Sequence, residues 1–317
     1  MIATPADQSE SGLKDRYRDF QYLAQEVLVL ERYNRAVLAE PDKGELRIHS
    51  FLALTLMALE RFLRMVLDER ATAGHTLPNL LEMATARRNR LFELGDREKT
   101  IRFVNGTRRV VMHGGLGVTN EAEHLLGYLL PLSLDLFRFT NAVVAAFDAA
   151  TGVAHPGARV EFLPSNVEPN DVRVVLTPVE ELISLNRHNK TYKPGDPEDG
   201  LLLFAEGALC MTLVEAAARQ WVGDGTLPKG AGFREVLEKA AEMGLRIPFD
   251  DPEDGIDRLA SVKNSIVHAN FEQAAQQASG RDVAAYFKEQ YAAEIEAMYQ
   301  VCLDFLGQVE ARDGEAA

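Results

Sequence analysis

Two segments 155 residues apart share a cation, then mostly apolar residues, and then a histidine five positions after the cation. Residues 108–113 read Arg-Arg-Val-Val-Met-His, and residues 263–268 read Lys-Asn-Ser-Ile-Val-His. Histidine titrates near neutral pH and can act as a general acid or base. A nearby cation can hold an anion such as a phosphate group and stabilise charge that develops on it. The candidate site residues are therefore His113, His268, Arg108, Arg109, Lys263 and Asn264.

The spacing within each motif leaves open which cation works with the histidine. On a regular helix, five residues turn the chain about 140° beyond a full revolution, so Arg108 and His113 do not share a face. Arg109 and His113 lie four residues apart and do share one, as do Asn264 and His268. Either the leading cation lies at an irregular helix start, or Arg109 is the working cation of the first motif.

Other residues recur in the same order, which indicates an internal duplication. Arg32 and Asn34 return 155 positions later as Arg187 and Asn189. A Pro/Gly pair returns at an offset of 156 and a Thr-Leu-Pro triplet at an offset of 150: Pro41 and Gly44 with Pro197 and Gly200, and residues 76–78 with residues 226–228.

Apolar periodicity predicts helices through both copies. In the first copy they cover residues 13–40, 45–72, 78–94, a motif helix capped by Asp96, and 121–150. In the second copy they cover residues 179–189, 201–221, 231–244, 256–271 and 281–310, and Asp254-Gly255 is interpreted as a loop that leads into a helix. Residues 159–163 and 172–176 have the β-branched content of strands.

The predicted fold class is therefore all-α, with two tandem helical bundles related by internal duplication and joined by a short, partly extended linker. The predicted boundaries are a disordered lead at 1–12, a first bundle at 13–151, a linker or hairpin at 152–177, a second bundle at 178–312 and a tail at 313–317.

The motifs in this helical setting resemble those of HEPN domains, a superfamily with an Arg, four to six residues and then His. Arg108 and His113 match this signature with four residues between them, whereas Lys263 stands where the family has Arg. The resemblance implies metal-independent RNA cleavage at a composite site formed where two such domains face each other, plausibly in a toxin or phage-defence system. His113 and His268 would then be the acid–base pair, Arg108 the main phosphate clamp and Lys263 a weaker one.

Charge limits the expected partners. The net charge of −14 argues against a general nucleic-acid coat. Residues 84–113 nevertheless carry eight Lys/Arg and three acids, whereas residues 229–268 carry six Lys/Arg and eight acids. Only the first copy suits a polyanion such as RNA. A partner protein and a homo-oligomer are further candidate partners.

Other patterns argue against metal, membrane and secretion. No histidine has neighbours at zinc-ligand spacing, so no cofactor is predicted. No apolar run is long enough to span a bilayer, and the first residues are not a secretory signal, so we expect a cytoplasmic protein without a membrane partner.

Two alternatives stay open. The chain is a non-catalytic HEPN-like module that binds a nucleotide or a partner protein, or the histidines only pack and hydrogen-bond inside the bundles. Glu60 and Glu215, each in the second helix of its copy, either face the cationic motif or are solvated surface charges; we favour the second interpretation.

Overall fold

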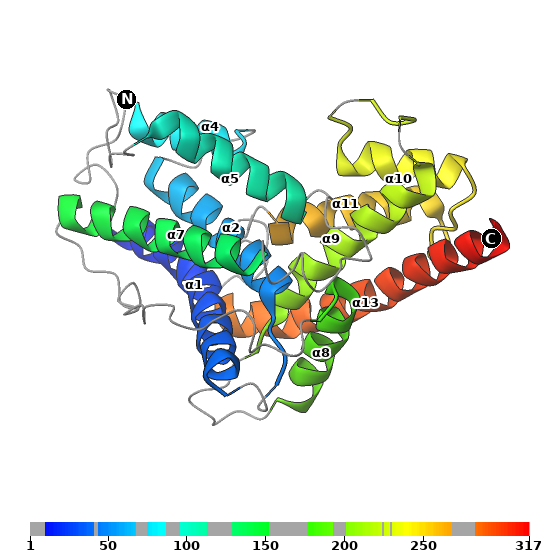
Figure 1. Cartoon of the computed structure of the whole chain (residues 1–317), viewed down its shortest axis with the longest axis horizontal. Helices are drawn as coiled ribbons and strands as arrows, with labels where there is room; N and C mark the ends of the chain where they lie inside the picture. The colour runs from blue at the N-terminus through cyan, green and yellow to red at the C-terminus, as the bar shows by residue number, and fades with distance from the viewer. Residues whose placement is uncertain are drawn as a thin grey trace. The chain divides into compact units, whose positions relative to one another are not determined.

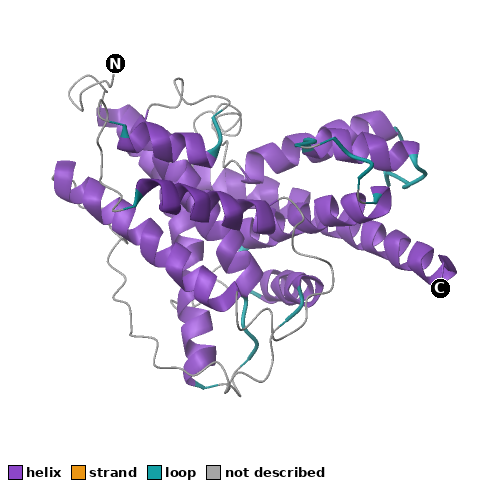
Figure 2. Cartoon of the chain, turned by 45° about the horizontal axis from the view of Figure 1, so that its top comes forward, coloured by secondary structure: helices purple, strands orange, loops and turns teal. Residues whose placement is uncertain are grey.

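The chain is all-α, as predicted. The computed structural model describes residues 10–40, 44–67, 75–86, 96–112, 129–151, 176–192, 201–223, 225–228, 230–267 and 283–316. Within these residues the regular structure is helical and no β-strand occurs (Figure 2). The predicted linker at 152–177, with its strand-like segments, lies outside the described residues except for positions 176 and 177.

The chain divides into two compact units. Unit 1 consists of residues 1–109 and 122–175, and unit 2 consists of residues 110–121 and 176–317. The helices of unit 1 are α1 (Glu10–Ala39), α2 (Ile48–Leu67), α4 (Leu77–Thr85), α7 (Leu130–Thr151) and most of α5 (Arg97–Met112), whose residues 110–112 fall in unit 2 (Figure 1). The helices of unit 2 are α8 (Pro178–Thr191), α9 (Leu203–Val222), α10 (Phe233–Glu242), α11 (Pro252–Val267) and α13 (Val283–Ala316).

Each unit is built around one central helix. In α2, 18 of 20 residues are buried, and α1, α4 and α7 pack against it. In α9, 17 of 20 residues are buried, and α8, α10, α11 and α13 pack against it. A helix that is apolar on nearly all sides must be surrounded by others, which explains this arrangement.

Two pairs of helices recur at one constant offset. α2 and α9 each contain 20 residues, and both their first and their last residues lie 155 positions apart. α5 and α11 each contain 16 residues and show the same offset at both ends. Within the described residues, the starts of these two pairs of helices thus share one offset.

A side-chain clamp also recurs at this offset. In unit 1, Arg47 N donates to Asn34 Oδ1 at 2.8 Å, and Asn34 Nδ2 donates to Arg47 O at 3.1 Å. In unit 2, Leu202 N donates to Asn189 Oδ1 at 2.7 Å, and Asn189 Nδ2 donates to Leu202 O at 3.1 Å. We call these two arrangements the asparagine clamps. Each ties the first helix of its unit to the backbone just before the central helix.

The predicted correspondence of the two Thr-Leu-Pro triplets is wrong. Thr76 is the residue before α4, and Pro78 lies in the first turn of that helix. Residues 226–228 instead lie in the loop before α10, which begins only at Phe233. Since α4 and α10 begin 156 positions apart, the counterpart of Pro78 is Arg234. The triplets match by composition only, because both precede a helix.

Helix α11 begins earlier than predicted, so Asp254-Gly255 is not a loop. The helix starts at Pro252, where proline is favourable because its missing N–H would have no helical partner. Asp251 Oδ1 accepts hydrogen bonds from the N–H groups of Glu253 and Asp254, at 2.9 and 3.3 Å. A Cβ atom at position 255 would lie 2.6 Å from the Phe249 ring, so glycine permits close packing there.

The terminal helices extend into segments expected to be irregular. α1 begins at Glu10, inside the lead predicted to be disordered, and an acidic residue at this end suits the helix dipole. α13 continues to Ala316, inside the predicted tail. Its last turns are held because Gln220 Nε2 donates to Asp313 at 2.9 Å and the Arg312 guanidinium lies 4.6 Å from the Trp221 ring centroid.

Candidate functional site

Helix α5 carries the described residues of the first motif. Asp96 caps its start, as predicted, because Asp96 Oδ1 accepts a hydrogen bond from Lys99 N at 3.0 Å. Val104 and Val111 of this helix are buried. Arg109 is exposed and Arg108 is half-buried. The structure thus places both arginines of the motif where solvent reaches at least part of each side chain.

The charge on α5 is strongly positive. The helix carries five basic residues and one acidic residue. An ion pair joins Arg102 to Glu98 at 3.4 Å, with both side chains more than two-thirds exposed, and such a pair contributes little energy. Neither Arg108 nor Arg109 forms an ion pair with another described residue. These cations are therefore not neutralised within the described part of unit 1.

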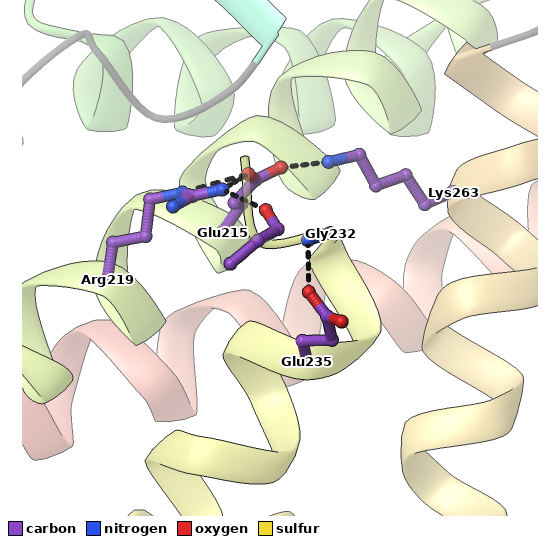
Figure 3. A network of polar contacts seen from close by, with 6 residues as sticks. Glu215, Arg219, Gly232, Glu235 and Lys263 are labelled. Atoms are coloured by element: carbon purple, nitrogen blue, oxygen red, sulfur yellow. Dashed lines mark hydrogen bonds and ion pairs between the residues drawn. The ribbon is translucent and has the colours of Figure 1, made fainter. Parts of the chain in front are cut away.

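The second motif has a different environment on α11. Lys263 is buried at 5% exposure and forms an ion pair with Glu215 (Figure 3). Its Nζ lies 4.4 Å from the centroid of the Phe233 ring. Asn264, the next residue, is exposed. A buried, paired ammonium group is not presented to a polyanion. The structure consequently places the leading cation of the second motif inside its own bundle.

Glu215 holds two cations at once. One carboxylate oxygen pairs with Lys263, and the other accepts hydrogen bonds from Arg219, whose Nη2 lies 2.6 Å away. Figure 3 shows the carboxylate between the two side chains. Arg219 Nη2 also donates to Ala231 O at 3.0 Å, in the loop that leads to α10. This buried cluster links α9, α11 and the α9–α10 loop.

The interpretation of Glu60 and Glu215 as solvated charges is wrong. Both are buried, with exposed fractions of 3% and 0%, because they lie on the central helices that other helices surround. Glu60 accepts from Arg64 Nη2 at 2.7 Å, and the same nitrogen donates to His75 O at 2.7 Å. This is the arrangement of Glu215 and Arg219 at an offset of 155.

The two units therefore differ at one equivalent position. Arg108 of α5 and Lys263 of α11 are 155 residues apart, as are Glu60 and Glu215. Lys263 pairs with Glu215, whereas no ion pair joins Arg108 to Glu60 among the described residues. Helix α5, which is rich in basic residues, thus carries Arg108, and this arginine forms no ion pair with the buried Glu60.

The two histidines of the motifs, His113 and His268, lie outside the described residues. The last described residues before them are Met112 and Val267. Their predicted pairing as acid and base stays a prediction.

Unit 2 contains a second polar network that the sequence did not suggest. Glu206 accepts hydrogen bonds from Asn186 and Asn189, both at 2.7 Å. Burial raises the pKa of Glu206, and these two hydrogen bonds offset only part of that rise. For Glu296, burial also opposes ionisation, but hydrogen bonds from Asn186 and Lys190 outweigh it and lower the pKa. The repeat of Asn34 at Asn189 was visible in the sequence, but its bonding partners were not.

Comparison with protein-family models, with curated proteins and with solved structures gives no match. Within the described ranges, no helix has both the length and the apolar character needed to cross a bilayer.

Proposed function

We propose that this chain binds RNA at the motif of unit 1 and cleaves it without a metal ion. In this proposal Arg108 and Arg109 hold the phosphate and His113 moves a proton. We also propose that the two units arose by internal duplication, that they are HEPN-like domains and that the protein acts in a toxin or phage-defence system. The single observation that supports it best is a contrast between the two motifs. Lys263 is buried against Glu215, whereas Arg108 and Arg109 on the basic helix α5 form no ion pair with another described residue.

The residue types of the first motif suit attack of a ribose 2′-hydroxyl on the adjacent phosphate. The hydroxyl must lose a proton and the leaving oxygen must gain one, and a histidine can do either near neutral pH. Negative charge develops on the phosphorus-bound oxygens during the attack. A guanidinium stabilises this charge with two parallel donors.

A second candidate is RNA binding without cleavage, or binding of a nucleotide or a protein by a non-catalytic module. The observation that favours it is again the Lys263–Glu215 pair, because a two-histidine site with two clamps needs a cation in each motif. Cleavage by one motif would depend on His113 alone or on a second copy of the chain.

Binding is tested with fluorescently labelled single-stranded RNA and the variant Arg109→Ala. We expect binding about fivefold weaker or more, and a salt dependence whose slope falls by about one, because one phosphate contact is lost. Arg138→Ala is the matched control, since Arg138 is an exposed arginine of unit 1 on α7 that pairs only weakly with Asp135. Equal effects of the two variants would contradict a role for the motif.

Cleavage is tested by incubating the same RNA with the protein in EDTA. We expect fragments from the wild type and intact RNA with His113→Ala, which should still bind. Binding with no fragments would favour the second candidate. A wild-type protein that neither binds nor cuts RNA would contradict both candidates that involve RNA.

A further inference from the structure

Helix α5 has a row of three exposed polar residues that extends the motif toward the helix start. Arg102, Asn105 and Arg109 are spaced three and four residues apart, so they lie on one face of the helix. We call this row the α5 stripe. None of the three side chains is buried, and among the described residues the ion-pair partner of Arg102 is the exposed Glu98. Such a pair is weak enough to be exchanged for a phosphate.

The spacing of the stripe fits a nucleic-acid strand. Arg102 and Arg109 are separated by about 10 Å along the helix axis, at about 1.5 Å per residue. At about 3.4 Å per nucleotide, the rise of a strand stacked in a duplex, this length covers at most three nucleotides, and it covers fewer in an extended single strand. Asn105 lies between the two arginines on the same face of the helix.

The chemistry of Asn105 fits a ribose. Its amide offers both a donor and an acceptor, and a 2′-hydroxyl can likewise both donate and accept. DNA lacks this hydroxyl. An exposed asparagine between two phosphate-binding arginines is therefore suited to discriminate RNA from DNA.

The equivalent face of α11 has lost these features. At an offset of 155 it presents Asp257, Ala260 and Asn264. Asp257 is an acid that pairs with Arg234 at 2.6 Å, and the middle position has no polar side chain. The same helix position in unit 2 thus offers neither the cations nor the central amide.

We propose that single-stranded RNA lies along the α5 stripe, with phosphates at Arg102 and Arg109 and a ribose 2′-hydroxyl at Asn105. This inference rests on the proposed function. A single strand is favoured over a duplex because the whole chain carries a net charge of −14, and a duplex has twice the linear charge density of one strand.

The test compares fluorescence anisotropy with single-stranded RNA and with deoxyuridine-containing DNA of the same sequence. We expect Asn105→Ala to weaken RNA binding about fivefold, the value of one hydrogen bond, and to leave DNA binding unchanged. Arg102→Ala should weaken both equally and lower the salt slope by about one. Asn79→Ala, an exposed asparagine of α4 outside both motifs, is the matched control and should change neither affinity.

The outcomes separate this inference from the proposed function. If Asn105→Ala changes RNA and DNA binding equally, or changes neither, the role of Asn105 is overturned while the loss of affinity in Arg109→Ala still supports the motif. Tighter binding of duplex RNA than of single-stranded RNA overturns the choice of strand. Absence of RNA binding by the wild type overturns both proposals.

Discussion

Glu215 lies at the centre of a buried cluster of charged side chains in unit 2. Its buried carboxylate neutralises Lys263 and also binds Arg219. Removing charges from water is costly, and a buried pair recovers that cost only while both partners are present. Loss of one partner is therefore much more harmful than loss of both.

We predict that Glu215→Ala lowers the unfolding free energy by about 3–5 kcal/mol, because Lys263 is then buried without its carboxylate. The double variant Glu215→Leu with Lys263→Met should lose less than either single variant. Urea titrations followed by tryptophan fluorescence measure these values. Glu238→Ala is the control, since Glu238 forms a half-exposed pair with Arg234 and should cost less than about 1 kcal/mol.

Glu206 gives unit 2 a dependence on pH. Burial raises its pKa in the folded protein above the usual 4.5. A raised pKa means that this group adds stability below pH 4.5 and that the contribution is lost as pH rises through the folded-state pKa. We predict that the wild type, measured relative to Glu206→Gln, is more stable at pH 4 than at pH 7. A stability of the wild type, relative to Glu206→Gln, that grows as pH rises would contradict this assignment.

At the scale of the elements, the asparagine clamps provide a matched pair of experiments. Each asparagine satisfies one backbone N–H and one backbone C=O before a central helix, at Arg47 in unit 1 and at Leu202 in unit 2. We predict that Asn34→Ala and Asn189→Ala each cost about 2–4 kcal/mol, since two buried backbone groups lose their partners.

Hydrogen exchange at the amides of Arg47 and Leu202 distinguishes the clamps. Each substitution should speed exchange at the amide of its own clamp. Asp at either position should protect the amide, because a carboxylate still accepts from N–H, and should leave the carbonyl without a donor. Unchanged exchange in both alanine variants would show that the clamps do not hold these segments.

Most helices could be predicted because their apolar periodicity is strong and their ends carry caps. Asp96 was identified as the cap of α5 from its position alone, and the start of α8 agrees with the prediction to within one residue. The start of α11 was missed because Asp254-Gly255 has the composition of a turn. The Phe249 ring that requires glycine there is a tertiary contact, which local sequence does not show.

The candidate site was predicted less completely than the helices. The offset of 155 located equivalent residues, including Arg108 and Lys263, but equal position did not imply equal environment. Whether a cation is exposed or paired depends on a glutamate 48 residues earlier in the chain, as for Lys263 and Glu215. Such long-range pairing follows from how α9 and α11 pack and has no local signal.

At the scale of the whole molecule, the single tryptophan offers a way to observe one unit alone. Trp221 lies on α9, so its fluorescence reports on unit 2, whereas far-ultraviolet circular dichroism reports on the helices of both units. We predict that in Glu215→Ala the fluorescence transition moves to lower urea while part of the dichroism signal is lost later. Coincident transitions would show that the two units unfold as one.

The Lys263–Glu215 pair also bears on how this chain could change over generations. A substitution at Lys263 or Glu215 leaves the other buried charge without its partner. A chain with only one of the two substitutions would therefore fold poorly. Two simultaneous substitutions are needed to pass this barrier, and selection rarely sees them together. Once formed, the Lys263–Glu215 pair would thus be retained. The exposed residues of α5, in contrast, can be replaced one at a time.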